Sequence, residues 1–280
     1  MTVTRGRPGG AGPAARSPGP SGEAGRPAEA VPGSRVLLVE DEPGLLRALL
    51  INLRARRYEV VTASAGHEAL AAASTWPPDA VILDLGLPDI DGTEVIAELR
   101  RWSRAPVIVL SGRVSPGDKI GALAAGADDY VTKPFSMAEL LARLRAVLRR
   151  DDTKPHGTAT AVVGCCVIDL AAHTVTRRPA RAMAATAGPP GEAQPGEAAQ
   201  PGESVRLTPT EWRILEHLLD RPGQLVGSRQ MLTDIWGSGY EHRTNYLRFH
   251  MARLRRKLEE NPARPRHLLT EPGMGYRYRP

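Results

Sequence analysis

The stretch VILDLGLPDIDG, residues 81–92, decides the fold of the first folded unit in this chain of 280 residues. Together with Ala80, its first residues form a short apolar run that ends at Asp84 and is followed by a turn segment with Pro and Gly. An apolar run bounded by turn residues is typical of a strand buried on both faces of a parallel sheet. Because ligands bind at the carboxyl ends of such strands, Asp84 is expected at a binding edge.

Working outward, similar apolar runs alternate with helical segments five times within residues 34–150. The expected strands are residues 36–39, 59–63, 80–83, 107–110 and 129–132. The expected helices are residues 44–56, 67–75, 93–101, 116–125 and 136–150. Strands that alternate with helices form a parallel sheet with helices on both faces, joined by right-handed crossovers. The predicted fold class of this part is therefore α/β, a doubly wound five-stranded parallel sheet of the flavodoxin-like type.

The C-terminal part predicts a second fold. Thr208-Pro209-Thr210-Glu211 begins a helix with a capping box, a shorter helix covers residues 228–236, and a third covers residues 245–259. The third helix carries an apolar stripe opposite an Arg-rich face. A final hairpin is expected at residues 268–270 and 276–278. This order of elements predicts a winged helix-turn-helix domain, whose basic face suits the major groove of DNA.

Composition divides the chain further. Residues 1–33 hold 8 Gly and 6 Pro, so we expect a disordered leader. The expected domains are residues 34–150 and 161–280, joined by a linker at 151–160. A low-complexity insertion at 178–204 repeats Pro-Gly-Glu three times. It is expected to interrupt a hairpin between strands at 173–177 and 205–207, next to further short strands at 161–167 and 168–170.

Charge and cysteine usage narrow the class of protein. The net charge of +6 lies mainly in residues 205–280, which favours a polyanionic partner for that segment. The two cysteines are adjacent, and a disulfide framework is excluded. They are expected on one strand, facing opposite ways. No apolar stretch is long enough for a membrane span, and the first residues lack the apolar core of a secretory signal. We therefore expect a cytoplasmic protein.

Four of the expected strand ends carry groups that suit phosphoryl transfer. Strand ends bring together the carboxylates of Glu40, Asp41 and Asp84 with the hydroxyl of Ser111 and the ammonium of Lys133. Clustered carboxylates suit Mg²⁺, which keeps waters for an incoming phosphate. A central aspartate can attack phosphorus to give an acyl phosphate. The sequence therefore predicts a phosphorylation site with Mg²⁺ as cofactor.

The motifs VLLVEDE, VILDLGLPDIDG, VIVLSGR and GADDYVTKPF closely resemble a response-regulator receiver domain over residues 34–150. The resemblance implies that Asp84 is the phosphoacceptor, phosphorylated by a sensor histidine kinase. It further implies that Glu40, Asp41, Asp84 and the Gly86 carbonyl hold Mg²⁺, and that the Lys133–Pro134 bond is cis. Ser111 and Tyr130 are then the switch pair, and Lys133 contacts the phosphoryl group.

The charged residues of segment 118–145 match the pattern of OmpR/PhoB-type regulators, whose receivers pair into a symmetric dimer. The resemblance implies a homodimer formed on phosphorylation through Lys119 with Glu139, Asp129 with Arg143, and Asp128 with Arg145.

The C-terminal domain is similar to the effector domain of the same family, so we expect promoter DNA as a partner. The expected DNA-binding residues are Arg243, Asn245, Tyr246, Arg248, Arg253, Arg255, Arg256, Arg266 and Arg277. The loop at residues 237–243 is expected to contact RNA polymerase. Pro272 stands where an Arg is common in the family, and this part of the chain most resembles regulators of the Kdp potassium-uptake operon.

Two alternatives stay open at this point. One is a transcription factor whose receiver does not signal through phosphate. The other is a Mg²⁺-dependent phosphatase of the haloacid dehalogenase type, which normally carries a second aspartate where this chain has Gly86. The sequence favours a regulator and not an enzyme.

Overall fold

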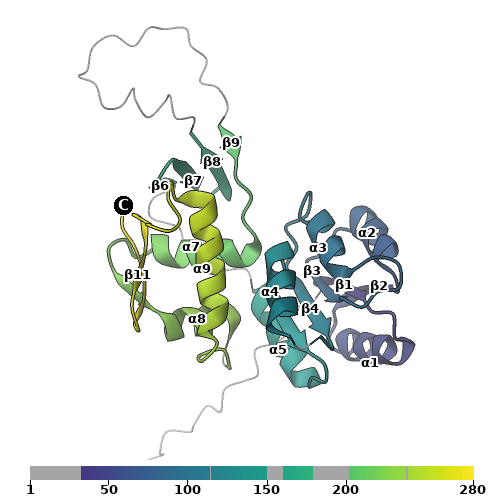
Figure 1. Cartoon of the computed structure of the whole chain (residues 1–280). Coiled ribbons are helices and arrows are strands. Elements are labelled where there is room, and N and C mark those ends of the chain that lie inside the picture. The colour runs from purple at the N-terminus through teal and green to yellow at the C-terminus, as the bar shows by residue number, and fades with distance from the viewer. Residues whose placement is uncertain (1–32, 114, 150–159, 179–201, 238) are drawn as a thin grey trace, which may run out of the picture.

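The structure is a computed structural model that describes residues 33–113, 115–149, 160–178, 202–237 and 239–280. Two lobes lie side by side, and α4 and α5 of the first lobe face the second lobe (Figure 1). The predicted leader except Gly33, the predicted linker except Thr160, and most of the predicted insertion at 178–204 lie outside the described residues. No helix in the described ranges is both long and apolar enough to cross a lipid bilayer.

The first lobe contains one parallel sheet in the order β2-β1-β3-β4-β5. Its strands are β1 (Arg35–Val39), β2 (Glu59–Ala63), β3 (Ala80–Asp84), β4 (Val107–Ser111) and β5 (Asp129–Thr132). Every residue of β3 and β4 is buried, as expected for central strands covered on both faces. The observed strand order is that of flavodoxin-like sheets, so the predicted fold class is confirmed.

Five helices cover this sheet in two layers. They are α1 (Pro43–Arg54), α2 (Gly66–Thr75), α3 (Gly92–Leu99), α4 (Pro116–Ala125) and α5 (Met137–Leu148). Leu49 and Leu53 of α1 and Leu144 of α5 pack on one face of the sheet. Helices α2, α3 and α4 pack on the other face. The helices begin at local caps: Ser136, for example, accepts a hydrogen bond from the Glu139 amide at the start of α5.

The second lobe has two small antiparallel sheets around three helices. One sheet is β6-β7-β8-β9 and the other is β10-β12-β11. The strands are β6 (Thr160–Val163), β7 (Cys166–Asp169), β8 (Thr174–Arg177), β9 (Glu203–Ser204), β10 (Leu225–Gly227), β11 (Leu268–Glu271) and β12 (Gly275–Tyr278). The helices are α7 (Pro209–Leu219), α8 (Ser228–Trp236) and α9 (Thr244–Leu258). This is the predicted winged helix-turn-helix, with α9 at its centre and β11-β12 as the wing.

Two local predictions in the second lobe are wrong. The strand that pairs with β8 is β9 and not residues 205–207, although the Val205 amide still bonds to the Val175 carbonyl at 2.9 Å. Cys165 and Cys166 do not share a strand, because residues 164–165 form the turn between β6 and β7. Gly164 adopts a positive φ of 56°, and a Cβ there would lie 2.9 Å from the Leu258 carbonyl oxygen. This turn therefore needs glycine.

The two lobes share one continuous apolar core. Ala122, Leu123 and Tyr130 of the first lobe belong to the same buried cluster as Trp236 and Tyr246 of the second lobe. Helix α5 also packs against α8. The parts of the chain that the sequence predicts as separate domains therefore meet through a packed interface in this structure.

Candidate functional site

The rim of the parallel sheet carries the predicted acidic pocket. Strand register aligns Val39 with Leu83 and Asp84 with Leu110, so neighbouring strands end side by side. Ligand oxygens of Glu40, Asp41 and Asp84 consequently lie within 4.8 Å of one another. Glu40 and Asp84 are buried, whereas Asp41 is exposed. The pocket thus combines an inner pair of carboxylates with an outer one that solvent reaches.

Lys133 closes the pocket from the end of β5. Its ammonium nitrogen donates to Asp84 Oδ2 at 2.6 Å and to both Glu40 carboxylate oxygens at 2.8 and 2.9 Å. The Lys133–Pro134 peptide bond is cis, as the family resemblance implies. The other Asp84 oxygen, Oδ1, accepts from the Gly86 amide at 3.1 Å. Asp84 is therefore held in place by both of its oxygens.

Burial and neighbouring charges shift the pKa values of Glu40 and Lys133 in this cluster. Burial raises the pKa of Glu40 and the neighbouring Asp84 carboxylate adds to that rise, although Lys133 opposes it. Burial would lower the pKa of Lys133, but its hydrogen bonds to Asp84 and Glu40 outweigh burial and raise it. A cluster in which carboxylates repel one another and attract a cation suits a hard divalent ion, because such an ion relieves the repulsion. The acidic cluster of Glu40, Asp41 and Asp84 is typical of the Mg²⁺-binding phosphorylation site of a receiver domain.

The loop after β3 is closely packed against the helix that follows it. A Cβ on Gly92 would lie 2.7 Å from both the Asp84 carbonyl oxygen and Leu85 Cα. Asp91 caps α3 by accepting from the Thr93 amide at 2.9 Å and also accepts from Arg113 Nη1 at 2.9 Å. The segment that holds Asp84 is therefore fixed from both sides.

Ser111 and Tyr130, the predicted switch pair, both contact Arg113. The Arg113 amide donates to the Ser111 hydroxyl at 3.0 Å, and the Tyr130 hydroxyl donates to the Arg113 carbonyl at 2.6 Å. Both side chains are buried, and the Lys119 ammonium lies 5.6 Å from the centre of the Tyr130 ring. The β4–α4 loop thus links the pocket to the face formed by α4, β5 and α5.

That face, which the sequence predicts as a dimer interface, is occupied by the second lobe. Asp128 Oδ1 accepts from the Thr210 amide at 3.0 Å, at the N-terminus of α7. Its Oδ2 accepts from Arg100 Nη2 at 2.8 Å, and its backbone carbonyl accepts from Trp236 Nε1 at 3.3 Å. Asp128 is fully buried and its hydrogen-bonding capacity is used within one chain.

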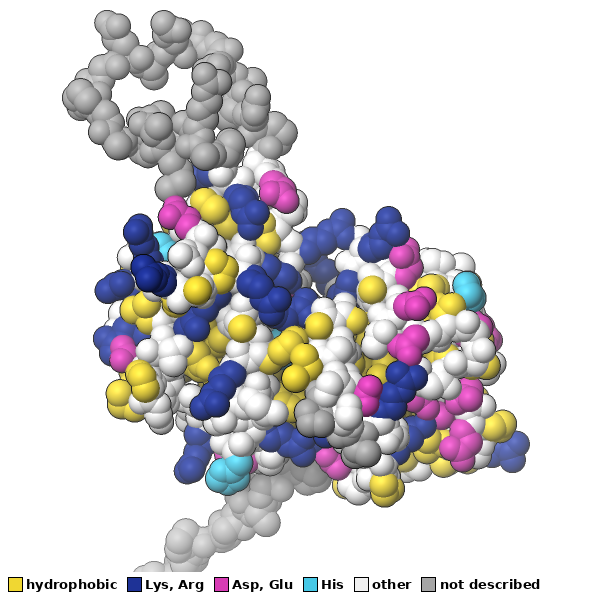
Figure 2. All heavy atoms as spheres, in the orientation of Figure 1, with side chains coloured by type: hydrophobic (Ala, Val, Ile, Leu, Met, Phe, Trp, Pro, Cys, Tyr) yellow, Lys and Arg dark blue, Asp and Glu magenta, His cyan; other side chains and the backbone are white. Residues whose placement is uncertain are grey.

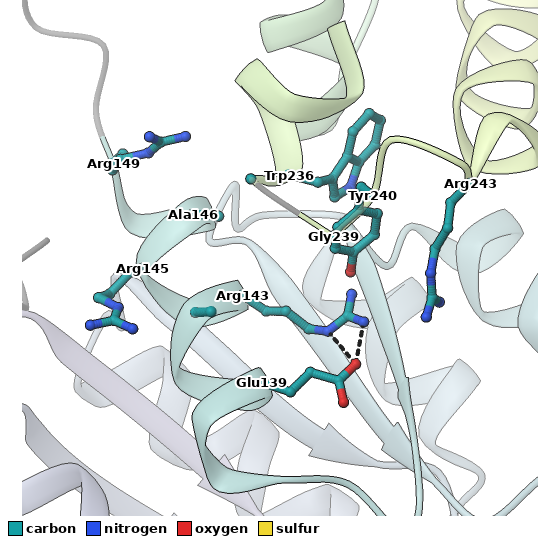
Figure 3. A pocket seen from close by; sticks show the side chains of 11 residues that line it. Glu139, Arg143, Arg145, Ala146, Arg149, Trp236, Gly239, Tyr240 and Arg243 are labelled. Carbon is teal, nitrogen blue, oxygen red and sulfur yellow. Dashed lines mark hydrogen bonds and ion pairs between the residues drawn. The ribbon is translucent and has the colours of Figure 1, made fainter. Parts of the chain in front are cut away.

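Asp129 is engaged in the same way. Arg143 Nη1 donates to Asp129 Oδ2 at 3.0 Å, and Arg143 Nη2 lies 2.5 Å from Glu139 Oε1. The Tyr240 ring stacks over the Arg143 guanidinium, with 4.4 Å between the ring centre and Cζ, and Arg243 lies on its other side (Figure 3). The Tyr240 hydroxyl bonds to Asp129, and Tyr246 bonds more weakly to the Tyr130 carbonyl at 3.4 Å. The predicted pairs between Asp129 and Arg143 and between Asp128 and Arg145 stay predictions for a dimer.

The predicted DNA-binding residues fall into three groups. Asn245, Arg248, Arg256 and Arg266 are exposed. Arg243 is half-buried against Tyr240 and Tyr246 is buried. Arg253 Nε donates to Glu211 at 2.9 Å, and its Nη1 reaches the Ala124 carbonyl at 2.8 Å. The remaining two residues lie at the wing. Arg255 donates to the Leu268 carbonyl at 2.8 Å, and Arg277 of β12 pairs with Glu271 at 3.1 Å. In this structure only the first group is directed to solvent.

Several residues of the interface have no signal in the sequence analysis. Trp236 is the last residue of the amphipathic helix α8, Tyr240 lies in the loop after it, and Arg100 caps the C-terminus of α3. Their positions follow no periodicity or motif that a single sequence shows, so a single sequence does not indicate them.

Comparison with known proteins identifies both lobes. Residues 36–145 match the response regulator receiver domain family, and residues 202–278 match the family described as transcriptional regulatory protein, C terminal. The chain is 50% identical over 243 residues to the transcriptional regulatory protein KdpE of Mycobacterium tuberculosis, covering 87% of this chain and 98% of that protein. It is 43% identical over 245 residues to the KDP operon transcriptional regulatory protein KdpE of Escherichia coli, covering 88% and 99%.

A solved structure supports the fold. The C128D mutant of RitR aligns with a TM-score of 0.67 at 24% identity, covering 88% of this chain and 99% of that one. The receiver pocket, the winged helix-turn-helix and the relatives agree on a two-component DNA-binding transcription regulator rather than an enzyme. The chain belongs to the OmpR/PhoB-type response regulators.

Proposed function

We propose that this chain is a phosphorylation-activated regulator in which a sensor histidine kinase phosphorylates Asp84. An Asp84 carboxylate oxygen attacks the phosphorus of a phosphohistidine, the new P–O bond replaces the P–N bond, and the imidazole leaves and takes up a proton. The observation that carries the proposal is the fixed position of Asp84, between the Lys133 ammonium and the Gly86 amide.

The residues of the pocket fit Mg²⁺, and we assign it to Glu40, Asp41, Asp84 and the Gly86 carbonyl. When bound, the ion offsets negative charge on the phosphoryl oxygens during transfer. Lys133 takes the same role on the other side of Asp84, and it exchanges its contact with the free carboxylate for one with the phosphoryl group. Ser111 lies at the adjacent strand end and is the hydroxyl donor for that group.

The second step is the exposure of the face formed by α4, β5 and α5. That face is covered by α7, α8, α9 and the loop before α9. The predicted homodimer therefore requires the two lobes to separate; its residues are Lys119, Asp128, Asp129, Glu139, Arg143 and Arg145. Phosphorylation acts through Ser111, Arg113 and Tyr130, which join the pocket to this face. To open the protein, phosphorylation must favour the open state by more free energy than the interdomain contacts give the closed state.

The open dimer binds promoter DNA through α9 and the wing. Asn245, Arg248 and Arg256 are available at once, whereas Arg243, Tyr246 and Arg253 become available only when the lobes separate. Arg255 and Arg277 support the wing, and Arg266 lies where it can meet phosphate. We assign the loop at residues 237–243 to RNA polymerase and the protein to the cytoplasm. The KdpE relatives make a potassium-transport operon the proposed target.

The test of this function is phosphotransfer to the full-length chain. Acetyl phosphate and Mg²⁺ should label the wild type with one acid-stable, base-labile phosphoryl group, and Asp84→Asn should stay unlabelled. Binding to a duplex from a kdp-type promoter should then increase in the labelled protein only. If the wild type binds that duplex equally well before and after labelling, the regulator acts independently of phosphorylation.

A further inference from the structure

A cavity separate from the acidic pocket lies in the cleft between the two lobes, on the side where α3 ends and α7 begins. Its volume is about 370 Å³, within the range of small-molecule sites. Five cationic side chains line it: Arg100, Arg104, Arg206, Arg253 and Lys257. Figure 2 shows Lys and Arg side chains gathered along this cleft. Among the described residues, no carboxylate lines the cavity.

The nearby negative charges are too few to balance these cations. Two fully buried carboxylates lie behind the cavity wall, Asp128 and Glu211. Asp128 pairs with Arg100, and Glu211 pairs with both Arg253 and Lys257, at 2.9 and 2.5 Å. The carboxylates are therefore fully engaged, and the cavity keeps an excess of about three positive charges at neutral pH.

The N-terminus of α7 does not account for an anion site here, because its amides are already bonded. The Thr210 amide donates to Asp128 and the Thr208 amide donates to Glu211 at 2.9 Å. Pro209, between them, has no amide hydrogen. Any ligand of this cavity is consequently recognised by the side chains.

Two of the cations have no carboxylate partner within the part of the chain that the structure describes. Arg104 of the first lobe donates to the His173 carbonyl of the second lobe at 2.9 Å. Arg206 of the second lobe reaches the Arg100 carbonyl of the first lobe at 3.5 Å. Each guanidinium thus crosses the cleft with one nitrogen and keeps further N–H donors for a ligand. Trp102, 47% exposed, lies at the edge of the same cavity.

The titration of Lys257 agrees with a positive local potential. Burial lowers the pKa of its ammonium, and Arg253 and Arg100 lower it further, although Glu211 acts in the opposite direction. A bound anion would reverse the effect of these neighbouring cations.

From this geometry we propose that the cavity binds a compact multivalent anion, a phosphate or diphosphate group, held between Arg104 of one lobe and Arg206 of the other. Guanidinium groups bind such oxyanions through charge-assisted, often bidentate hydrogen bonds. Because the cavity exists only while the lobes are in contact, the anion stabilises the closed arrangement. By linkage it must then oppose the opening that DNA binding requires.

The test is calorimetric titration of inorganic pyrophosphate into the unphosphorylated full-length chain, at fixed ionic strength. Mg²⁺ is left out so that the Asp84 pocket does not take up the probe. Arg104→Gln and Arg206→Gln remove one cation each. Arg101→Gln is the matched control, since Arg101 lies in the turn after α3, does not line the cavity and pairs with the exposed Glu98. We expect one site per chain, weakened roughly tenfold in each of the first two variants and unchanged in the control.

Equal affinities in the wild type and the three variants would mean that pyrophosphate binds only by non-specific attraction. The absence of saturable binding up to roughly 10 mM would exclude the anion site. A random-sequence DNA duplex tests the other source of phosphate groups. If Arg104→Gln weakens duplex binding but pyrophosphate does not bind, the cavity residues contact the DNA backbone and the proposal is wrong. None of these measurements depends on phosphorylation of Asp84, so they are independent of the proposed function.

Discussion

The phenol oxygen of Tyr240 lies 2.6 Å from Asp129 Oδ1 and 2.5 Å from Asp129 Oδ2, although the two residues are 111 positions apart in the chain. Tyr240 belongs to the loop before α9, and Asp129 begins β5 of the receiver domain. The carboxylate that the dimer is expected to use is therefore bound by the DNA-binding domain of its own chain. The predicted dimer and the interdomain contact therefore require the same side chain.

Removing the hydroxyl of Tyr240 should favour the open arrangement. Tyr240→Phe keeps the stacking on Arg143 but loses hydrogen bonds to a buried carboxylate, which contribute about 1.5–3 kcal/mol. We expect the unphosphorylated variant to bind promoter DNA at least tenfold more tightly than the wild type, as measured by fluorescence anisotropy. Tyr58→Phe is the matched control, because the buried Tyr58 hydroxyl has no hydrogen-bond partner in the part of the chain that the structure describes. Identical DNA affinities of the two variants would refute the competition.

Arg143 should be important for the stability of the closed protein. Its side chain is only 5% exposed, and it pairs with Asp129 and Glu139. Arg143→Ala leaves the buried Asp129 without its cation, so we expect a loss of about 3–5 kcal/mol in the free energy of unfolding by urea. Arg101→Ala, at a 75% exposed position, should change it by less than about 0.5 kcal/mol. The same Arg143 variant should also fail to dimerise after phosphorylation; an intact dimer would reject the predicted pairing.

Gly92 should be intolerant of a side chain. Its Cβ would lie 2.7 Å from the backbone that carries Asp84, so Gly92→Ala has to displace the phosphorylation loop. We expect a loss of about 1–3 kcal/mol in stability and slower phosphorylation by acetyl phosphate. Gly121→Ala is the control within α4, where a Cβ meets nothing within 4 Å. That substitution should stabilise the protein by about 0.5–1 kcal/mol. Equal effects of the two substitutions would contradict the close packing.

The burial of His250 should make the stability of the protein depend on pH. It is buried in α9 with neither ring nitrogen hydrogen-bonded among the described residues, and burial lowers its pKa to about 4. The unfolded chain, with a pKa near 6.5, therefore binds a proton that the folded protein excludes. Stability attributable to His250 is fully present above about pH 6.5 and is lost as the pH falls towards 4.

The measurement for His250 is urea unfolding of the wild type and His250→Phe at a series of pH values. The difference between the two proteins isolates this group from Asp129, whose pKa burial raises to about 6. We expect the variant to gain about 2–3 kcal/mol relative to the wild type between pH 6.5 and 4.5. A constant difference over this range would mean that His250 is not buried in the neutral form.

The receiver fold and its pocket were predictable because their signals are local. Each buried strand is an apolar run, and the observed strands end within one residue of the predicted ones; β3, for example, reaches Asp84 itself. In a parallel sheet the strand ends meet at one edge, so Glu40, Asp84, Ser111 and Lys133 could be placed together without coordinates. The predicted ends of the helices differ from the observed ends by one or two residues, as at α1 and α5, because the last turn depends on capping contacts.

The interdomain contact was not predictable in the same way. The partners of Asp128 and Asp129, Thr210 and Tyr240, are distant in sequence, and no periodic pattern relates them. Helix α9 illustrates the same point. Its apolar stripe is visible in the sequence, but the remaining surface divides between solvent, wing and receiver domain. Arg256 faces solvent, Arg255 contacts the wing and Arg253 contacts α4, a division that only tertiary packing determines.

Phosphorylation-driven dimerisation is tested by the solution mass of the full-length chain in light scattering, with and without Mg²⁺ and beryllofluoride. Beryllofluoride on Asp84 stands in for the phosphoryl group. We expect a monomer that doubles in mass on addition of beryllofluoride, and an Asp84→Asn variant that stays monomeric. A wild-type mass that does not change, or an Asp84→Asn variant that doubles equally, would contradict phosphorylation-driven release of the α4, β5 and α5 face.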